Sequence, residues 1–217
     1  MNNCINVELI IFDLDGTLVD SQEGIVHSIQ HMIDYFQLPV KTPQEIRSYI
    51  GTGVEDLVRK STGSKGKIIP EGSIKYFKDT FKQIGNVYAR LYPNVIEILE
   101  YFKNKKKVII TNRQYDMAVA TLQHFNIEKY FTDLTGGDDI DCMKPSSCPL
   151  VKSIKKYDIE KNKTIIVGDM AIDIIAGQSA GIYTCACMGG IGKKDDIKKA
   201  GPDFMIEDLI ELKRIVC

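Results

Sequence analysis

One stretch, residues 7–20, constrains the fold of this 217-residue chain more than any other. An apolar run from Val7 to Phe12 ends abruptly in Asp13-Leu14-Asp15-Gly16-Thr17. A short run of β-branched and aromatic residues bounded by glycine is typical of a buried strand. Because side chains alternate along a strand, Asp13 and Asp15 leave its end on roughly the same side. Ligands of open parallel sheets bind beyond the carboxyl ends of the strands, so this stretch predicts a functional site.

Two carboxylates at the end of a strand are compatible with several chemistries. They can hold Mg²⁺, a hard cation that takes oxygen ligands. One can attack phosphorus, since Asp forms aspartyl-phosphate intermediates in some enzymes, and the other can transfer protons. A bare Asp-x-Asp pair is equally compatible with a loop that carries two solvated acids. The remainder of the chain therefore has to distinguish these readings.

From residue 93 onward, strand patterns alternate with helix patterns. The expected strands cover residues 108–111, 131–135, 164–167, 183–188 and 204–206. The expected helices cover residues 95–102, 115–125, 146–157, 170–180, 195–200 and 207–216. Such alternation predicts a parallel sheet with right-handed crossovers. The fold class is therefore α/β, a Rossmann-like parallel sheet flanked by helices.

Residues 20–90 carry helical patterns instead. Apolar residues spaced three and four apart predict helices over 23–36 and 72–92, the second weakened by Gly85. Another helix is expected over 54–61, and Thr42-Pro43 with Glu45 has the spacing of a capping box. We therefore expect a core domain of residues 1–19 and 91–217, with an α-helical cap domain of residues 20–90 inserted into it.

Composition excludes some classes of partner. With 28 basic and 29 acidic residues, the chain lacks the electrostatic footprint of a nucleic-acid-binding protein. No segment has the length of a transmembrane helix, and the N-terminus lacks the pattern of a signal peptide. We expect no membrane association and no obligate protein partner.

The cysteines and glycines suggest no further site. The six cysteines are scattered, and Cys185 and Cys187 lie in an apolar, strand-like run. They are expected to be packed thiols rather than metal ligands, which favours a reducing, cytoplasmic location. Residues 63–67 (GSKGK) lack the spacing of a phosphate-binding P-loop, and residues 189–192 (GGIG) are too short for a dinucleotide-binding fingerprint.

Three further polar motifs follow expected strands or precede helices. They are Thr111-Asn112-Arg113, Lys144-Pro145 and Gly168-Asp169 with Asp173 one helical turn later. Hydroxyl, amide and lysine groups can bind phosphate oxygens, and Asp173 lies on the same side of its helix as Asp169. Taken singly, these motifs are also compatible with turns, helix caps or surface residues.

Taken together and in this order, the motifs resemble those of the haloacid dehalogenase (HAD) superfamily in its phosphatase form. Asp13-x-Asp15-Gly16-Thr17 resembles the first motif, residues 109–112 the second, Lys144-Pro145 the third, and Gly168-Asp169-x-x-x-Asp173 the fourth. The resemblance covers essentially the whole chain, because the helical insert matches the cap of that family.

The resemblance implies a role for each residue. Asp13 would be the nucleophile, and Asp15 would protonate the leaving oxygen and then deprotonate water. The metal would be Mg²⁺, held by Asp13, Asp15 (through its backbone carbonyl) and Asp169, with Asp173 acting through water or by supporting these ligands. Thr111 and Lys144 would also assist catalysis. The phosphoryl group would be bound by Gly16, Thr111, Asn112, Arg113 and Lys144.

The subclass follows from single positions. The dehalogenases and phosphonatases of this superfamily lack the second aspartate of the first motif, whereas this chain has Asp15 there, which disfavours both classes. Ile25 occupies the place of a histidine of the hexose-phosphate mutases, which disfavours a mutase. Residues 50–53 (IGTG) in the cap resemble the phosphoglycolate phosphatases. However, Ser146-Ser147 follows Lys144-Pro145 without the second proline of that group, and Arg113 stands where a lysine is usual.

The expected function is hydrolysis of a small phosphorylated metabolite by a Mg²⁺-dependent phosphatase, through a phosphoaspartate. A pyrophosphatase, a 5′-nucleotidase or a sugar phosphatase of the same superfamily is the alternative. A phosphotransferase is another enzymatic alternative, and a phosphate or acyl-phosphate sensor is the non-enzymatic one. Retention of Asp15, which a sensor would not need for turnover, favours an enzyme.

Overall fold

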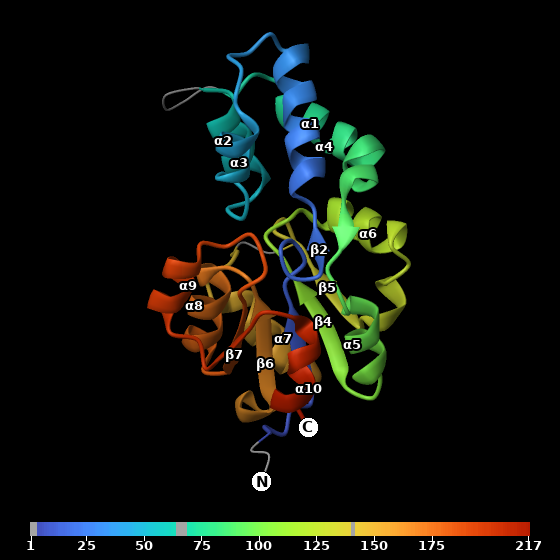
Figure 1. Cartoon of the computed structure of the whole chain (residues 1–217), viewed down its shortest axis with the longest axis vertical. Helices are drawn as coiled ribbons and strands as arrows, with labels where there is room; N and C mark the ends of the chain where they lie inside the picture. Colours follow the sequence, from blue (N-terminus) through green and yellow to red (C-terminus); the bar gives the residue numbers. More distant parts are fainter. Residues whose placement is uncertain (1–3, 64–68, 140–141) are drawn as a thin grey trace.

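A six-stranded parallel sheet with the order β5-β4-β1-β6-β7-β8 forms the centre of the fold (Figure 1). Its strands are β1 (Leu9–Phe12), β4 (Lys106–Ile110), β5 (Asp133–Thr135), β6 (Thr164–Gly168), β7 (Tyr183–Cys187) and β8 (Phe204–Ile206). This computed structural model describes residues 4–63, 69–139 and 142–217, so most of the GSKGK segment (residues 64–67) lies outside the described residues. The predicted α/β class is confirmed. Strand β1 lies between β4 and β6, which places Asp13 at the middle of the sheet edge.

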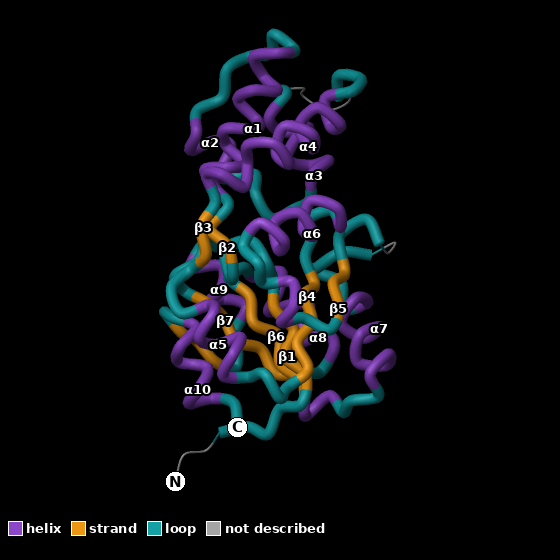
Figure 2. Tube along the Cα trace, turned by 90° about the vertical axis from the view of Figure 1, so that its right-hand side faces the viewer, coloured by secondary structure: helices purple, strands orange, loops and turns teal. Residues whose placement is uncertain are grey.

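Helices cover both faces of the sheet (Figure 2). One face packs against α5 (Val95–Tyr101), α6 (Tyr115–His124) and α10 (Leu212–Ile215). The other packs against α7 (Cys148–Tyr157), α8 (Ala171–Ala180) and α9 (Lys194–Ala200). Alternation along β1 explains both layers, because Ile10 and Phe12 belong to the first core and Leu9 and Ile11 to the second.

The inserted helices stand above the carboxyl edge of the sheet as a cap with its own apolar core (Figures 1 and 2). They are α1 (Gln22–Tyr35), α2 (Pro43–Arg47), α3 (Val54–Ser61) and α4 (Ser73–Ile84). The expected capping box is present, since the Glu45 N–H donates to Thr42 Oγ1 over 3.2 Å and the Thr42 N–H donates to Glu45 Oε2 over 2.8 Å. The domain boundaries at residues 19/20 and 90/91 stay a prediction.

The prediction of one helix over residues 72–92 is wrong at its C-terminal end. Helix α4 ends at Ile84, and a separate 3-10 helix, η1 (Gly85–Tyr88), follows it. The backbone then forms β3 (Arg90–Leu91), which pairs antiparallel with β2 (Val19–Asp20). Two-residue strands carry no periodicity, so the sequence gives no signal for this ribbon. It joins the two crossings between the core and the cap.

Gly24 explains how η1 reaches α1. A Cβ atom on Gly24 would lie 2.1 Å from the carbonyl oxygen of Gly85. Any larger residue at position 24 would therefore push the exit of the cap away from α1.

The last α-helix of the chain is shorter than the sequence predicts. Instead of one helix over 207–216, the 3-10 helix η4 (Leu209–Glu211) precedes α10. The side chain of Asp208 caps η4 and accepts from the Ile210 N–H over 2.9 Å. Asp208 thus starts the helix later than the apolar pattern indicates. Within the described ranges, no helix combines the length and apolar character of a membrane span.

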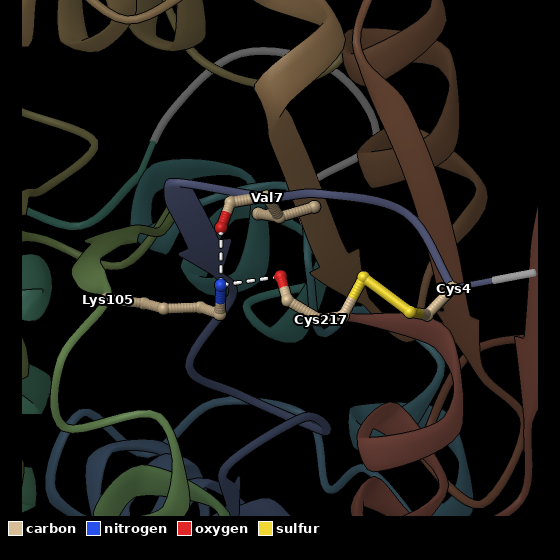
Figure 3. Close-up of a disulfide and its surroundings, with 4 residues drawn as sticks. All are labelled: Cys4, Val7, Lys105 and Cys217. Atoms are coloured by element: carbon tan, nitrogen blue, oxygen red, sulfur yellow. Dashed lines mark hydrogen bonds between the residues drawn. A yellow bond between two sulfur atoms is a disulfide. The ribbon is translucent and has the colours of Figure 1, made fainter.

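Four of the six cysteines form two disulfides. Cys4 and Cys217, with Cα atoms 5.6 Å apart, form a disulfide (Figure 3) at the end of the molecule away from the cap, where Figure 1 marks both termini. Lys105 Nζ donates to the carbonyl oxygens of Val7 and Cys217 over 2.7 and 2.6 Å at the same place (Figure 3). Cys142 and Cys148 form the second disulfide. Cys185 and Cys187 are buried and free, so their prediction as packed thiols is confirmed.

Candidate active site

Asp13 and Asp15 occupy the loop that directly follows the central strand β1. The Asp13 backbone N–H donates to the Val167 carbonyl of β6 over 2.9 Å, which fixes the first turn of this loop. Asp15 Oδ1 accepts from the hydroxyl of Ser21 and from the guanidinium of Arg113. The two carboxylates therefore have different surroundings, as two different chemical roles require.

Three buried carboxylates meet at this sheet edge. Asp13 follows β1, Asp169 follows β6, and Asp173 lies one turn into α8. Each offers an oxygen, and these oxygens lie within 4.8 Å of one another. Neighbouring parallel strands end at one edge, so residues far apart in the chain converge.

Lys144 balances part of this charge. Its Nζ lies 2.8 Å from Asp13 Oδ1 and 2.6 Å from Asp173 Oδ1, and its side chain is 1% exposed. Three carboxylates facing one ammonium leave an excess of two negative charges in a buried place. Isolated buried charge is unfavourable, and Mg²⁺ prefers oxygen ligands. The donor set therefore fits a divalent cation held by Asp13, Asp169 and Asp173.

The titration of these groups reflects their burial. Burial raises the pKa of Asp173 to about 6; the Lys144 ammonium opposes this shift and the Asp13 carboxylate adds to it. Burial also raises the pKa of Asp169 well above its usual value, and the charges of Asp13 and Asp173 add to the effect. For Lys144, burial lowers the pKa, but the Asp13 and Asp173 carboxylates outweigh it and the pKa is raised.

Backbone N–H groups hold Asp169 in place. Its Oδ2 accepts from the N–H groups of Ile191 and Gly192 over 2.9 and 3.2 Å. Its Oδ1 accepts from the hydroxyl of Thr17 over 3.1 Å. The sequence assigned no site to the glycine-rich segment after β7, because the segment is too short for a dinucleotide-binding fingerprint. In the structure its backbone N–H groups bind a candidate metal ligand.

Gly16 is required by the same packing. It has φ +84°, and a Cβ there would lie 2.1 Å from Asp169 Oδ2. Only glycine adopts this conformation without strain and leaves room for the carboxylate.

The loop after β4 joins three parts of the site. Asn112 Nδ2 donates to the Lys144 carbonyl over 2.8 Å, and the Lys144 N–H donates to Asn112 Oδ1 over 2.9 Å. Asn112 Nδ2 also donates to the carbonyl of Gly51 in the cap over 3.2 Å. The Thr111 hydroxyl accepts from the Arg113 N–H over 3.1 Å and lines the central cavity. Asn112 therefore positions the lysine loop with its side chain.

Arg113, which was expected to bind phosphate, lines the central cavity, and its role there stays a prediction. Its guanidinium pairs with Asp15, and its side chain is 4% exposed. Burial raises the pKa of Asp15 above its usual value, and the Arg113 charge and the Ser21 hydrogen bond oppose this shift. A cavity of about 50 Å³ lies between these residues and the cap.

The family follows from comparison with known proteins. The family model described as "Haloacid dehalogenase-like hydrolase" matches residues 10–187. The chain belongs to the haloacid dehalogenase-like hydrolases. The resemblance seen in the sequence is therefore confirmed.

Several relatives of this hydrolase are named phosphoglycolate phosphatases, which specifies a substrate within the family. A phosphoglycolate phosphatase of Haemophilus influenzae is 32% identical over 220 residues, which cover 96% of this chain and 98% of that protein. One from Aquifex aeolicus is 31% identical, over 95% of this chain and 96% of its own. The crystal structure of a predicted phosphoglycolate phosphatase from Haemophilus somnus has a TM-score of 0.86 and 28% identity, and the match covers 96% and 97% of the two chains. The chain is an enzyme of the phosphoric monoester hydrolase class.

Most residues that the sequence predicted for the site of this hydrolase converge in the structure, but the residues that support them were missed. The structure brings Asp13, Asp169, Asp173 and Lys144 together and places Thr111 and Asn112 beside them. The contact of Ser21 with Asp15, the contact of Thr17 with Asp169 and the role of residues 190–192 were not anticipated. The only signal of these residues is their position: each lies in a segment that follows a strand at the same edge.

Proposed function

We propose that this hydrolase is a Mg²⁺-dependent phosphatase that cleaves a small phosphate monoester through a phosphoaspartate on Asp13. The observation that carries the proposal is the Asp13 carboxylate, held at the end of β1 within the carboxylate cluster and 2.8 Å from the Lys144 ammonium. The proposed nucleophile, acid and cation then line one cavity, and the carboxylates that could bind a metal lie beside the nucleophile, as phosphoryl transfer requires.

In the first step, an oxygen of Asp13 attacks phosphorus. The bond between Asp13 and phosphorus forms as the ester P–O bond breaks, and Asp15 donates a proton to the departing alkoxide. In the second step, Asp15 takes a proton from water as the water oxygen attacks the phosphoaspartate. Asp13 is released and inorganic phosphate leaves.

The chain's own groups supply the remaining stabilisation. Lys144, the Thr111 hydroxyl and the backbone N–H groups near Gly16 and Asn112 are proposed to bind the transferring phosphoryl oxygens. Asp13, the Asp15 carbonyl, Asp169 and Asp173 would hold Mg²⁺. When bound, Mg²⁺ would offset the repulsion between the carboxylate nucleophile and the phosphate dianion.

The names of the relatives support 2-phosphoglycolate as the substrate. Pyrophosphate, nucleoside monophosphates and sugar phosphates are the alternatives, and a phosphate sensor or a phosphotransferase would use the same pocket without net hydrolysis. No nucleic-acid, membrane or obligate protein partner is proposed.

The test is release of inorganic phosphate from a panel of esters, with and without Mg²⁺. The panel contains 2-phosphoglycolate, pyrophosphate, nucleoside monophosphates, sugar phosphates and p-nitrophenyl phosphate. We expect Mg²⁺-dependent turnover that falls by at least about 10³-fold in Asp13→Asn. Asp79→Asn is the matched control, because Asp79 is exposed and, among the described residues, is paired with Lys75 alone.

Two results would contradict the proposal. Phosphate binding without turnover of any ester would favour a sensor. Transfer of the phosphoryl group to an added alcohol, faster than to water, would favour a phosphotransferase.

A further inference from the structure

The cap contributes only apolar side chains to the central cavity. Among the described residues that line it, those from the cap are two glycines and Ile25, Ile50, Val54, Leu57 and Phe77. A leaving group rich in hydroxyls would lose its hydrogen bonds to water there and gain none from the cap. The cavity measures about 50 Å³, which favours a leaving group of few atoms.

The core provides the cations. Two of the described lining residues are cationic, Lys144 and Arg113. Lys144 forms ion pairs with Asp13 and Asp173, next to the carboxylate that would attack phosphorus. Arg113 is paired with Asp15, on the side where the leaving oxygen would receive its proton. Arg113 is thus the cation nearest to the expected leaving group.

The guanidinium of Arg113 is held in one orientation. Its Nη1 donates to the Thr121 hydroxyl over 2.8 Å, and its carbon lies 4.5 Å from the centre of the Phe81 ring in the cap. The Thr121 hydroxyl in turn donates to Asn86 Oδ1 over 2.8 Å, in η1. Arg113 is therefore positioned by both core and cap. A guanidinium has five N–H donors, so contacts with Asp15 and Thr121 leave donors for a third partner.

We propose that Arg113 is a specificity-determining residue that binds a carboxylate of the leaving group. The enzyme would then select phosphate esters of small hydroxy acids. The proposal rests on the proposed phosphatase activity at Asp13. A guanidinium matches the planar geometry of a carboxylate, and an apolar, buried wall strengthens the pairing relative to water. Since Arg113 touches Asp15, its carboxylate partner would lie close to the ester oxygen, as in a two-carbon hydroxy acid.

The experiment compares three esters of similar size that differ in charge. They are 2-phosphoglycolate, ethyl phosphate and 2-aminoethyl phosphate, whose leaving groups are anionic, neutral and cationic, and each is assayed with Mg²⁺ for kcat/KM. Variants are Arg113→Gln, Arg113→Lys and the control Arg47→Gln, an exposed cap arginine paired with Glu23. We expect the wild type to prefer 2-phosphoglycolate over ethyl phosphate by about 100-fold, the size of a charged hydrogen-bonded pair.

Arg113→Gln should reduce this preference to about threefold or less, mainly through the loss on 2-phosphoglycolate. Arg113→Lys keeps the charge without the planar fork and should retain an intermediate preference. Arg47→Gln should leave the preference unchanged. Equal loss on all three esters in both Arg113 variants would overturn the proposal, since Arg113 would then only position Asp15. A wild type that cleaves ethyl phosphate as well as 2-phosphoglycolate would also overturn it.

Ligand binding, measured without turnover, tests the role of Arg113 independently of the proposed phosphatase activity. The ratio of Kd values for 2-phosphoglycolate and ethyl phosphate is measured with Asp13→Asn protein, with and without Arg113→Lys. If no ester is turned over, the proposed function fails, but a Kd ratio that depends on Arg113 still supports carboxylate recognition. A ratio near one in the Asp13→Asn protein overturns it.

Discussion

Lys144 and Asp173 form an ion pair of 2.6 Å in which both side chains are sealed from solvent. Lys144 also lies 2.8 Å from Asp13, so a single ammonium pairs with one acid that follows β1 and with another in α8. This relationship makes the lysine part of both the stability and the chemistry of the site.

Replacement of Lys144 by Met should destabilise the metal-free protein by about 3 kcal/mol, because it leaves two buried carboxylates without their cation. Turnover should be lost as well. The measurement is chemical unfolding with and without Mg²⁺, and Mg²⁺ should restore part of the loss. Lys163→Met is the control, since Lys163 is partly exposed in its pair with Glu8 and should cost less than about 1 kcal/mol. Equal losses in the two variants would contradict the assigned role.

Mg²⁺ affinity should decrease as the pH falls. The folded-state pKa of Asp173 is raised from 3.8 to about 6, so below about pH 6 a proton competes for this ligand. Between pH 7.5 and pH 5 the Kd should increase by about tenfold from this group alone. Calorimetry at several pH values measures it. Asp173→Asn should bind Mg²⁺ more weakly throughout and with a flatter pH profile; a pH-independent wild-type Kd would contradict the prediction.

The same shift has the opposite effect on the metal-free protein. Between the unfolded pKa of 3.8 and the folded value of about 6, the folded state binds the Asp173 proton more tightly. Its contribution to the free energy of unfolding is therefore larger at pH 5 than at pH 7, and it is lost as the pH rises through about 6. Unfolding of wild type and Asp173→Asn at both pH values checks the sign, because the variant should lack this difference.

Gly16 should not tolerate a methyl group. In Gly16→Ala the Cβ would meet Asp169 Oδ2 at 2.1 Å, so Asp169 must move and Mg²⁺ affinity should fall by at least about tenfold. Gly72→Ala is matched, because Gly72 has φ +80° but no described atom within 4 Å of its added Cβ. It should cost about 1 kcal/mol of stability through backbone strain alone. Unchanged Mg²⁺ binding in Gly16→Ala, measured by calorimetry, would be inconsistent with this packing.

The Cys4–Cys217 disulfide should contribute strongly to stability. It closes a loop with a sequence separation of 213, for which chain entropy corresponds to about 5 kcal/mol. The Cys142–Cys148 disulfide, with a separation of 6, corresponds to about 2 kcal/mol. Unfolding of the double variants Cys4→Ser/Cys217→Ser and Cys142→Ser/Cys148→Ser compares the two. A larger loss from the shorter loop would contradict the entropic account.

The cytoplasmic location stays a prediction, and thiol content tests it. Disulfides persist mainly in oxidising compartments. Protein that is denatured directly in an alkylating reagent and analysed by mass spectrometry should carry two alkyl groups if both disulfides are formed, on the free thiols of Cys185 and Cys187. Six free thiols would indicate a reducing location and unpaired Cys4, Cys142, Cys148 and Cys217.

The sequence-based prediction succeeded best for the strands of the central sheet. The apolar runs at residues 7–12, 108–111 and 164–167 predicted β1, β4 and β6, and the polar residues after them are the ones that converge. Helix α3 was predicted at the observed bounds, Val54–Ser61. The failures are the end of α4 and the ribbon of β2 and β3, where two-residue strands are defined by pairing between residues about 70 apart, such as Asp20 and Arg90.

The sequence by itself determined the α/β class, the helical insert and the identity of the acidic and basic groups at the strand ends. These features depend on periodicity and on neighbours in the chain, which are local properties. Tertiary structure alone decided that Arg113 pairs with Asp15 and that the backbone of residues 191–192 donates to Asp169. Such contacts join segments separated by 98 and about 22 residues, and they form only because parallel strands bring their carboxyl ends to one edge.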